Sequence, residues 1–285
     1  MTGVRSGPRS HGAEPMTPPS GPDRTYGTVT GACRRAARRL RAEYNRVLVV
    51  GALLVLLPTI VVVERLRRGT GRRLARWGVS VVAALCGVRF VVGGSRPIVP
   101  VGRAVVTPNH SSPMDIPALL FALPSIRFLA AADLFRIPLL ASAMRALGTQ
   151  PIDRRDHDRS QRQLDALVAD RRAGDGFDLA IFPEGGIAPA GVRLPFKSGA
   201  FTLAIRTTSA IVPVAIHGTD AVLRPKGRLL VRPGVVTIEF LDGIATDGLT
   251  LDDRHVLRDH VQDLVTTALT ERMVVPPLPT DPTTR

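Results

Sequence analysis

A histidine and an aspartate lie five residues apart in the segment 109–115 (NHSSPMD). A strand-like run ends at Pro108 and a helix is expected to begin near Pro113, so we expect His110 on a loop at a strand end, where catalytic groups are common. There the chain can bend to bring Asp115 back to the imidazole. A carboxylate on one ring nitrogen fixes the tautomer and makes the other nitrogen a better base. The pair predicts a general base, although a structural histidine held by a hydrogen bond explains the spacing about equally well.

Two further segments combine glycine with charged side chains. Residues 182–186 (FPEGG) follow the apolar run 178–182 and place Glu184 before two glycines, which permits close approach of the backbone to a ligand. Residues 148–154 (GTQPIDR) end in Arg154, whose planar guanidinium can bind two phosphate oxygens at once. Taken singly, an ordinary Gly-Gly turn and a solvated arginine are strong alternative interpretations.

Taken in their order along the chain, these motifs resemble the blocks of the glycerolipid acyltransferase family, the 1-acylglycerol-3-phosphate acyltransferases and their relatives. The resemblance covers about residues 97–245. An HxxxxD motif alone is weakly specific, whereas the ordered set is strongly so. The matching segments are 109–115 (the HxxxxD motif), 127–130 with 133–138, 148–154, 182–185, 196–200 (FKSGA) and 211–214 (IVPV).

The resemblance implies a direct acyl transfer in which His110, oriented by Asp115, accepts the proton of an acceptor hydroxyl. The resulting alkoxide attacks the thioester of an acyl-CoA or an acyl carrier protein, and a free thiol leaves. The implied acceptor is a lysophospholipid, 1-acylglycerol-3-phosphate, which becomes phosphatidic acid. The residues that the resemblance assigns to substrate binding are Arg154, Glu184, Gly185 and Lys197.

The chain departs from the family pattern at two places that bear on the acceptor. The third block usually continues with Thr and Arg after Glu-Gly, but Gly186 and Ile187 stand there, so a hydroxyl and a cation are missing on the phosphate side. The second block has Pro151 where an aromatic or aliphatic residue is common. Acyl transfer is the expected reaction, with Arg154 holding the acceptor phosphate. Transfer to another lipid or glycolipid acceptor is the alternative.

From residue 97 onward, short β-rich runs alternate with helical patterns. This is typical of an α/β domain with a central, mainly parallel or mixed sheet flanked by helices. We assign residues 95–275 to it and expect 276–285, rich in Pro and Thr, to be loose. The expected strands are 104–107, 126–130, 178–182, 211–216 and 235–240. The expected helices are 133–147, with an N-cap at Asp133 and a stop at Gly148, 160–172 and 256–269.

The N-terminal part of the chain has a different character. Residues 1–32 are rich in Gly, Pro, Ser and Thr and predict a disordered arm. Residues 33–94 hold two apolar segments, 47–63 and 77–94, between runs of arginine. If both segments crossed a bilayer, the arginines between them would lie outside, against the positive-inside rule. We therefore expect a helical hairpin in the cytoplasmic leaflet of the cell membrane, with its arginines on anionic headgroups. A buried hairpin in a soluble protein is the alternative.

The amino-acid composition bears on which partners and cofactors the protein can have. The 285 residues carry 38 Lys+Arg against 24 Asp+Glu, a formal charge of +14, which suits a polyanion or an anionic membrane surface. Aromatic residues make up 4% and are too scarce for base stacking, so we expect no nucleic-acid partner. Two cysteines form no zinc cluster, and no nucleotide fingerprint is present, so neither a metal nor a cofactor is expected. A non-catalytic protein that binds anionic membranes is the alternative outside the enzymes.

Overall fold

The computed structural model describes residues 24–94, 104–123, 125–153, 155–172, 177–189, 192–224 and 229–271. The chain divides into two compact units, residues 1–40 and 41–285. The described part of the first unit is the start of a helix, on which Arg39 and Leu40 are exposed. The second unit holds the rest of that helix, the sheet and the candidate site.

The helices and strands have the following bounds. The helices are α1 (Arg24–Leu66), α2 (Thr70–Cys86), α3 (Asp115–Ala122), the 3₁₀ helix η1 (Ala132–Arg136), α4 (Pro138–Ala146), α5 (His157–Arg172), α6 (Gly199–Arg206), α7 (Thr219–Val222), the 3₁₀ helix η2 (Leu251–Asp253) and α8 (Arg254–Glu271). The strands are β1 (Val88–Gly94), β2 (Val105–Pro108), β3 (Arg127–Ala131), β4 (Gln150–Ile152), β5 (Leu179–Ala180), β6 (Ile211–His217) and β7 (Gly234–Phe240).

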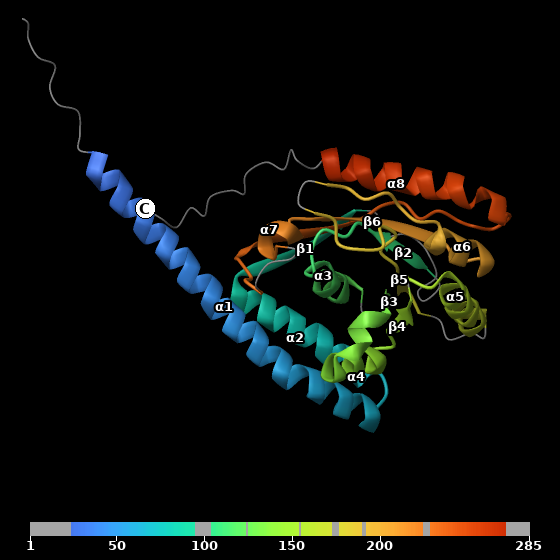
Figure 1. Ribbon diagram of the computed structural model, residues 1–285, viewed down its shortest axis with the longest axis horizontal. Coiled ribbons are helices and arrows are strands. Elements are labelled where there is room, and N and C mark those ends of the chain that lie inside the picture. The colour runs from blue at the N-terminus through green and yellow to red at the C-terminus, as the bar shows by residue number, and fades with distance from the viewer. Residues whose placement is uncertain are drawn as a thin grey trace, which may run out of the picture. The chain divides into compact units, whose positions relative to one another are not determined.

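Within the described residues, seven strands form one sheet in the order β1-β7-β6-β2-β5-β3-β4 (Figure 1). Strands β2 to β6 run parallel, β7 runs antiparallel to β6, and β1 runs parallel to β7. The predicted α/β fold with a mixed, mainly parallel sheet is confirmed. Because β2 and β5 are parallel neighbours, the segments that follow them leave the sheet at the same edge.

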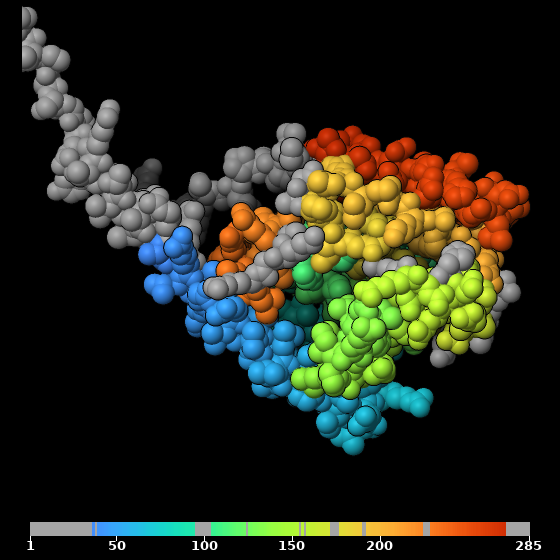
Figure 2. All heavy atoms as spheres, viewed as in Figure 1, coloured from blue at the N-terminus to red at the C-terminus, as the bar shows by residue number. Residues whose placement is uncertain are grey.

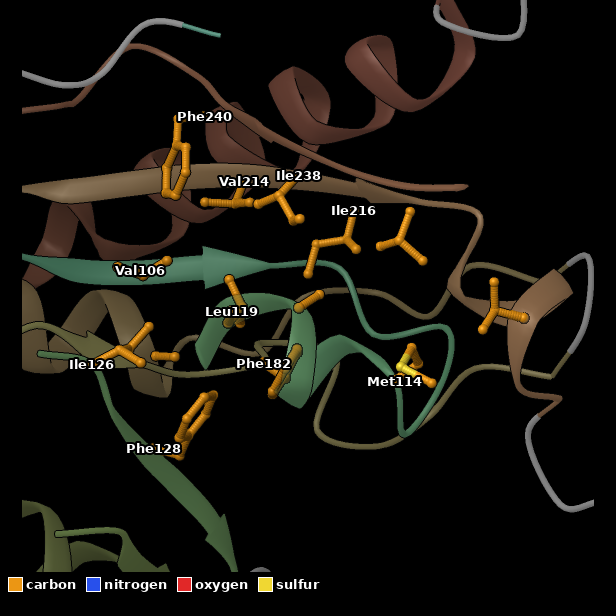
Figure 3. Close-up of a cluster of buried hydrophobic side chains, with 14 of the residues drawn as sticks. Val106, Met114, Leu119, Ile126, Phe128, Phe182, Val214, Ile216, Ile238 and Phe240 are labelled. Carbon is orange, nitrogen blue, oxygen red and sulfur yellow. The ribbon is translucent and has the colours of Figure 1, made fainter. Parts of the chain in front are cut away.

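Alternate residues of the inner strands point to opposite faces of the sheet and build two apolar cores. On β2, Val105 packs into the core that contains Val261 of α8, whereas Val106 packs into the core that contains Leu119 of α3. Figure 3 shows the core that contains Val106, in which Phe182 lies close to Leu119. Helices α2 and α3 therefore cover one face of the sheet, and α5, α6 and α8 cover the other.

Polar bonds hold α1 against the end of α2. Asn45 is fully buried on α1, and its Nδ2 donates to the carbonyl oxygens of Cys86 at 3.1 Å and Val231 at 2.9 Å. Arg41 Nη2 donates to the carbonyl oxygen of Leu85 at 3.1 Å. The bonds to Leu85 and Cys86 satisfy carbonyl groups at the C-terminus of α2, which have no partner within their own helix, and the bond to Val231 ties α1 to the segment before β7.

The turn between α1 and α2 is closed by Glu64. Its two carboxylate oxygens accept the backbone N–H groups of Gly69 and Gly71, each at 2.8 Å. A carboxylate at a helix N-terminus is stabilised by the unsatisfied N–H groups there. Midway along the pair the helices approach closely, since a Cβ on Gly78 would lie 2.7 Å from Leu56 Cδ1. We call this pair of helices the α1–α2 hairpin.

The predicted N-terminal segments need two corrections. The apolar segment 77–94 is not one helix, because α2 ends at Cys86, where Gly87 adopts the left-handed φ of +75°. Residues 88–94 form strand β1, paired with β7, so they belong to the sheet and not to the hairpin. The arm expected at 1–32 is helical from Arg24 onward, as part of α1. Residues 1–23 and the tail 276–285 lie outside the described residues.

The single helix predicted over 133–147 is wrong in its first turn. The segment forms η1 and then α4, with Ile137 between them in an extended conformation and Pro138 at the first position of α4. Proline disfavours the helical conformation in the residue before it, which explains the break. Asp133 lies in η1 and forms an ion pair with Arg155. The other predicted strands and helices are found with small shifts, while β4 and α6 were not expected.

Candidate active site

The structure brings the predicted histidine and aspartate together beyond the carboxyl end of β2. His110 Nδ1 lies 2.8 Å from Asp115 Oδ2. The same oxygen accepts the backbone N–H groups of Ser111 and Ser112, both at 2.9 Å. Asp115 is the first residue of α3 and is fully buried. The orientation of the carboxylate is therefore fixed by the backbone as well as by the imidazole.

This contact assigns a role to each ring nitrogen. An ionised carboxylate only accepts hydrogen bonds, so Nδ1 carries the hydrogen and Nε2 presents its lone pair. The side chain of His110 is mostly buried, with 12% of its surface exposed. A histidine in this arrangement can take a proton from a hydroxyl group at Nε2.

Buried hydrogen bonds fix the loop that carries the histidine. Asn109 exchanges two bonds with the backbone of Ile216 on β6: its Nδ2 donates to the carbonyl oxygen at 3.1 Å, and its Oδ1 accepts the N–H at 2.7 Å. Ser112 Oγ donates to the carbonyl oxygen of Leu223 at 2.6 Å and accepts the N–H of Met114 at 3.0 Å. Sequence reasoning missed these positioning roles, because the partners lie 107 and 111 residues away.

The segment after β5 packs directly against the histidine. The rings of Phe182 and His110 stack with centroids 3.9 Å apart and planes inclined by 22°. Glu184 Oε1 accepts the backbone N–H of His110 at 2.8 Å. Burial raises the pKa of the Glu184 carboxyl group, and the backbone N–H groups of His110 and Leu194 oppose this rise by stabilising the ionised form. The predicted motifs at 109–115 and 182–186 therefore belong to one site.

Gly185 and Lys197 lie against each other beside this segment. Gly185 has a φ of +75°, and a Cβ there would lie only 2.8 Å from Lys197 Nζ. The backbone N–H of Lys197 donates to the carbonyl oxygen of Pro183 at 2.8 Å, which ties the two motifs together. Around Gly186 the structure is open, since a Cβ there would meet no atom within 4 Å. The site thus has a positive charge and free space next to Glu184.

Arg154, the predicted phosphate ligand, lies outside the described residues, so its role stays a prediction. The neighbouring arginines form surface ion pairs: Arg155 Nη2 lies 2.8 Å from Asp133 Oδ2, and Arg159 Nη1 lies 3.4 Å from Asp153 Oδ2. In the part of the chain that the structure describes, no group of three or more His, Cys, Asp or Glu side chains is placed to hold a metal ion.

Known proteins are similar to this chain in sequence. A family profile described as Acyltransferase matches residues 89–217, which include both the HxxxxD motif and Glu184. The protein acl-2 of Caenorhabditis elegans is 32% identical over 191 residues, which cover 65% of this chain and 66% of acl-2. The 1-acyl-sn-glycerol-3-phosphate acyltransferase alpha of Mus musculus is 30% identical over 193 residues, which cover 66% of both chains.

A solved structure shares the fold. The crystal structure of the 1-acyl-sn-glycerophosphate (LPA) acyltransferase PlsC from Thermotoga maritima aligns with 85% of this chain and all of its own, with a TM-score of 0.67 at 24% identity. The chain therefore belongs to the acyltransferase family, and the predicted enzyme class is confirmed. The match to the two curated relatives spans 66% of the length of each.

Proposed function

We propose that the protein transfers a fatty acyl chain from acyl-CoA or an acyl carrier protein to the free hydroxyl of 1-acylglycerol-3-phosphate, which gives phosphatidic acid. The observation that carries this proposal is the 2.8 Å contact between His110 Nδ1 and Asp115 Oδ2, because it leaves Nε2 as a proton acceptor. The name of the mouse relative, 1-acyl-sn-glycerol-3-phosphate acyltransferase alpha, supports the choice of acceptor.

His110 and Asp115, which we call the dyad, perform the reaction in the following way. His110 Nε2 accepts the proton of the acceptor hydroxyl while the oxygen of that hydroxyl attacks the thioester carbonyl carbon. The new C–O bond forms, the C–S bond breaks, and the leaving thiolate takes the proton back from the imidazolium. Asp115 stabilises the imidazolium through Nδ1, and no serine or cysteine of the protein needs to act as a nucleophile. General-base catalysis of this kind contributes about 10²–10⁴ in rate.

The other site residues position the reactants. Glu184 holds the backbone of His110 and so acts on the imidazole indirectly. Lys197 brings a positive charge to the backbone of Gly185, where it can attract an anionic substrate group. Arg154 would hold the acceptor phosphate, as the resemblance to the family implies.

The open space at Gly186 favours a second candidate, transfer to a lipid acceptor without a terminal phosphate or with a larger polar group. Replacing Arg154 with Ala separates the two. If Arg154 binds the phosphate of 1-acylglycerol-3-phosphate, the KM for this acceptor should rise about tenfold to hundredfold, the factor expected for one charge-assisted hydrogen bond. The KM for monoacylglycerol should stay unchanged. Equal effects on both acceptors would favour the second candidate.

The α1–α2 hairpin supports attachment to a membrane, which we propose to be the cytoplasmic face of the cell membrane. Its segment Arg39–Leu66 has 28 residues and is long and apolar enough to cross a bilayer, and only 6% of its most apolar window is buried. Exposed apolar surface of this extent suits lipid better than water. A helix that spans the membrane and one that lies in a single leaflet are both compatible with this length.

The proposed reaction is tested by release of free thiol from acyl-CoA in the presence of 1-acylglycerol-3-phosphate. Replacing His110 with Ala should lower kcat by about 10²–10⁴ while the circular dichroism spectrum stays unchanged. Replacing His260, an exposed histidine of α8, with Ala is the matched control and should leave kcat unchanged. Full activity of a folded H110A protein would refute the mechanism.

A further inference from the structure

A pocket of about 470 Å³ lies beside β4, the last strand of the sheet. It is bounded by η1, the end of α4, β4 and the first half of α5. These segments are coloured green to yellow-green in Figure 2. Its polar and aromatic lining consists of Phe135, Arg145, Thr149, Gln150, Arg159 and Gln163. Neither His110 nor Asp115 lines this pocket, and its volume is typical of a site for a small molecule.

The lining combines two guanidinium groups with an aromatic ring. Arg145 Cζ lies 5.4 Å from the centre of the Phe135 ring, so cation and ring share one wall. Arg159 is 3.4 Å from Asp153, a long contact for which a phosphate can compete. Gln163 Oε1 accepts the N–H of Asp153 at 2.8 Å, which orients the amide and leaves Nε2 as a donor. Guanidinium groups bind phosphate, and an aromatic face stacks on a base, so this lining suits a nucleotide.

The distance between the pocket and the dyad favours the acyl donor over the acceptor. Strand β2, which leads to His110, is separated from β4 by β5 and β3, so three spacings of about 4.8 Å put the two strands roughly 14 Å apart. In 1-acylglycerol-3-phosphate the reacting hydroxyl and the phosphate are on adjacent carbons, so with the hydroxyl at His110 the phosphate could be met only by a long side chain that extends toward the site, as proposed for Arg154, and not by the pocket itself. In acyl-CoA the long phosphopantetheine arm separates the thioester from the nucleotide and can span this distance.

We propose that the pocket binds the adenosine 3′,5′-bisphosphate end of CoA. Phe135 stacks on the adenine, and Arg145 and Arg159 bind the phosphate groups. This inference rests on the proposed acyl transfer and makes CoA the donor. An acyl carrier protein presents its thioester on the same arm but has no nucleotide to fill the pocket.

The test compares acyl-CoA with S-acylpantetheine, which has the same thioester but lacks the nucleotide. Replacing Arg145 or Arg159 with Ala should raise the KM for acyl-CoA about tenfold to hundredfold, as for one lost charge-assisted hydrogen bond. The KM values for S-acylpantetheine and for the acceptor should not change. Replacing Arg162 with Ala is the matched control, because it removes an exposed guanidinium of α5 that does not line the pocket.

Calorimetry with free CoA gives a second measurement that needs no acceptor and no turnover. The wild type should bind CoA, and the R145A and R159A proteins should bind it at least tenfold more weakly. Unchanged affinity for CoA in both folded variants would overturn the inference. A rise in the KM for the acceptor would also overturn it, by assigning the pocket to that substrate.

The same experiments separate this inference from the proposed function. If the wild type uses an acyl carrier protein and does not distinguish acyl-CoA from S-acylpantetheine, the pocket is not a CoA site, although acyl transfer stands. If no donor supports acyl transfer to any acceptor tested, the proposed function fails. Binding of CoA that depends on Arg145 and Arg159 would still support the pocket in that case.

Discussion

Replacing Asp115 with Asn tests whether the two residues of the dyad work as a unit. In the wild type, one buried carboxylate oxygen accepts bonds from His110 Nδ1 and from the backbone N–H groups of Ser111 and Ser112. Asparagine keeps the size of the side chain and one acceptor oxygen, so the loop should remain folded. The negative charge that faces the imidazole is lost.

The size of the effect follows from the geometry. At an effective dielectric constant of about 20, unit charges 2.8 Å apart attract each other by roughly 6 kcal/mol. If about half of the positive charge has developed on His110 in the transition state, roughly 3 kcal/mol of stabilisation disappears in the variant. Because each 1.36 kcal/mol corresponds to a factor of ten, kcat should fall about 100-fold.

The assay is thiol release from acyl-CoA at saturating 1-acylglycerol-3-phosphate, with thermal unfolding as the check on the fold. Replacing Asp133 with Asn is the matched control, since its carboxylate pairs with Arg155 on the surface. That control should retain wild-type kcat. If the folded D115N enzyme kept kcat within threefold of the wild type, the carboxylate would not support the imidazolium, and the reasoning would be wrong.

Three further predictions concern stability and membrane binding. Replacing Asn45 with Ala leaves two buried carbonyl oxygens without their donor, so the free energy of unfolding should fall by roughly 2 kcal/mol in chemical denaturation, and unchanged stability would contradict the role of Asn45. Burial raises the pKa of Glu184 above its ordinary 4.5, so the folded state binds this proton more tightly than the unfolded chain does. The wild type should therefore lose stability relative to E184Q as the pH rises from about 4.5 through the raised pKa, and parallel stability curves would argue against this burial effect. Full-length protein should sediment with anionic vesicles through the arginines of residues 33–94, each contributing about 1 kcal/mol near the surface; equal recovery in the supernatant with neutral and anionic vesicles would contradict this.

The contact between His110 and Asp115 could be predicted from the sequence because the two residues are close along the chain and follow a short apolar run. The contact between Glu184 and His110 could be inferred for a related reason. His110 follows β2 and Glu184 follows β5, and parallel neighbouring strands end at the same edge of the sheet. The bonds of Asn109 to Ile216 could not be predicted in this way. They depend on β6 lying next to β2, and the order of strands in a sheet is not contained in local patterns.

The errors came from apolar segments that suit both helix and strand. Residues 77–94 are apolar apart from Ser80 and Arg89, and apolarity alone does not separate α2 from β1. Gly87 carried the missing signal, because glycine in the left-handed conformation commonly ends a helix. Pro138 carried a similar signal inside the predicted helix 133–147, where it marks the start of α4.

The α1–α2 hairpin has its polar bonds at its ends and its apolar side chains along its outer surface. In water, burial of apolar surface drives helices together, but in lipid this driving force is absent and helix pairs depend on close packing and hydrogen bonds. Gly78 allows the close packing against Leu56, and Asn45 and Glu64 supply bonds that become stronger where water is excluded. The close contact at Gly78 and the bonds of Asn45 and Glu64 would therefore hold the two helices together in a bilayer as well, where burial of apolar surface contributes nothing to their association.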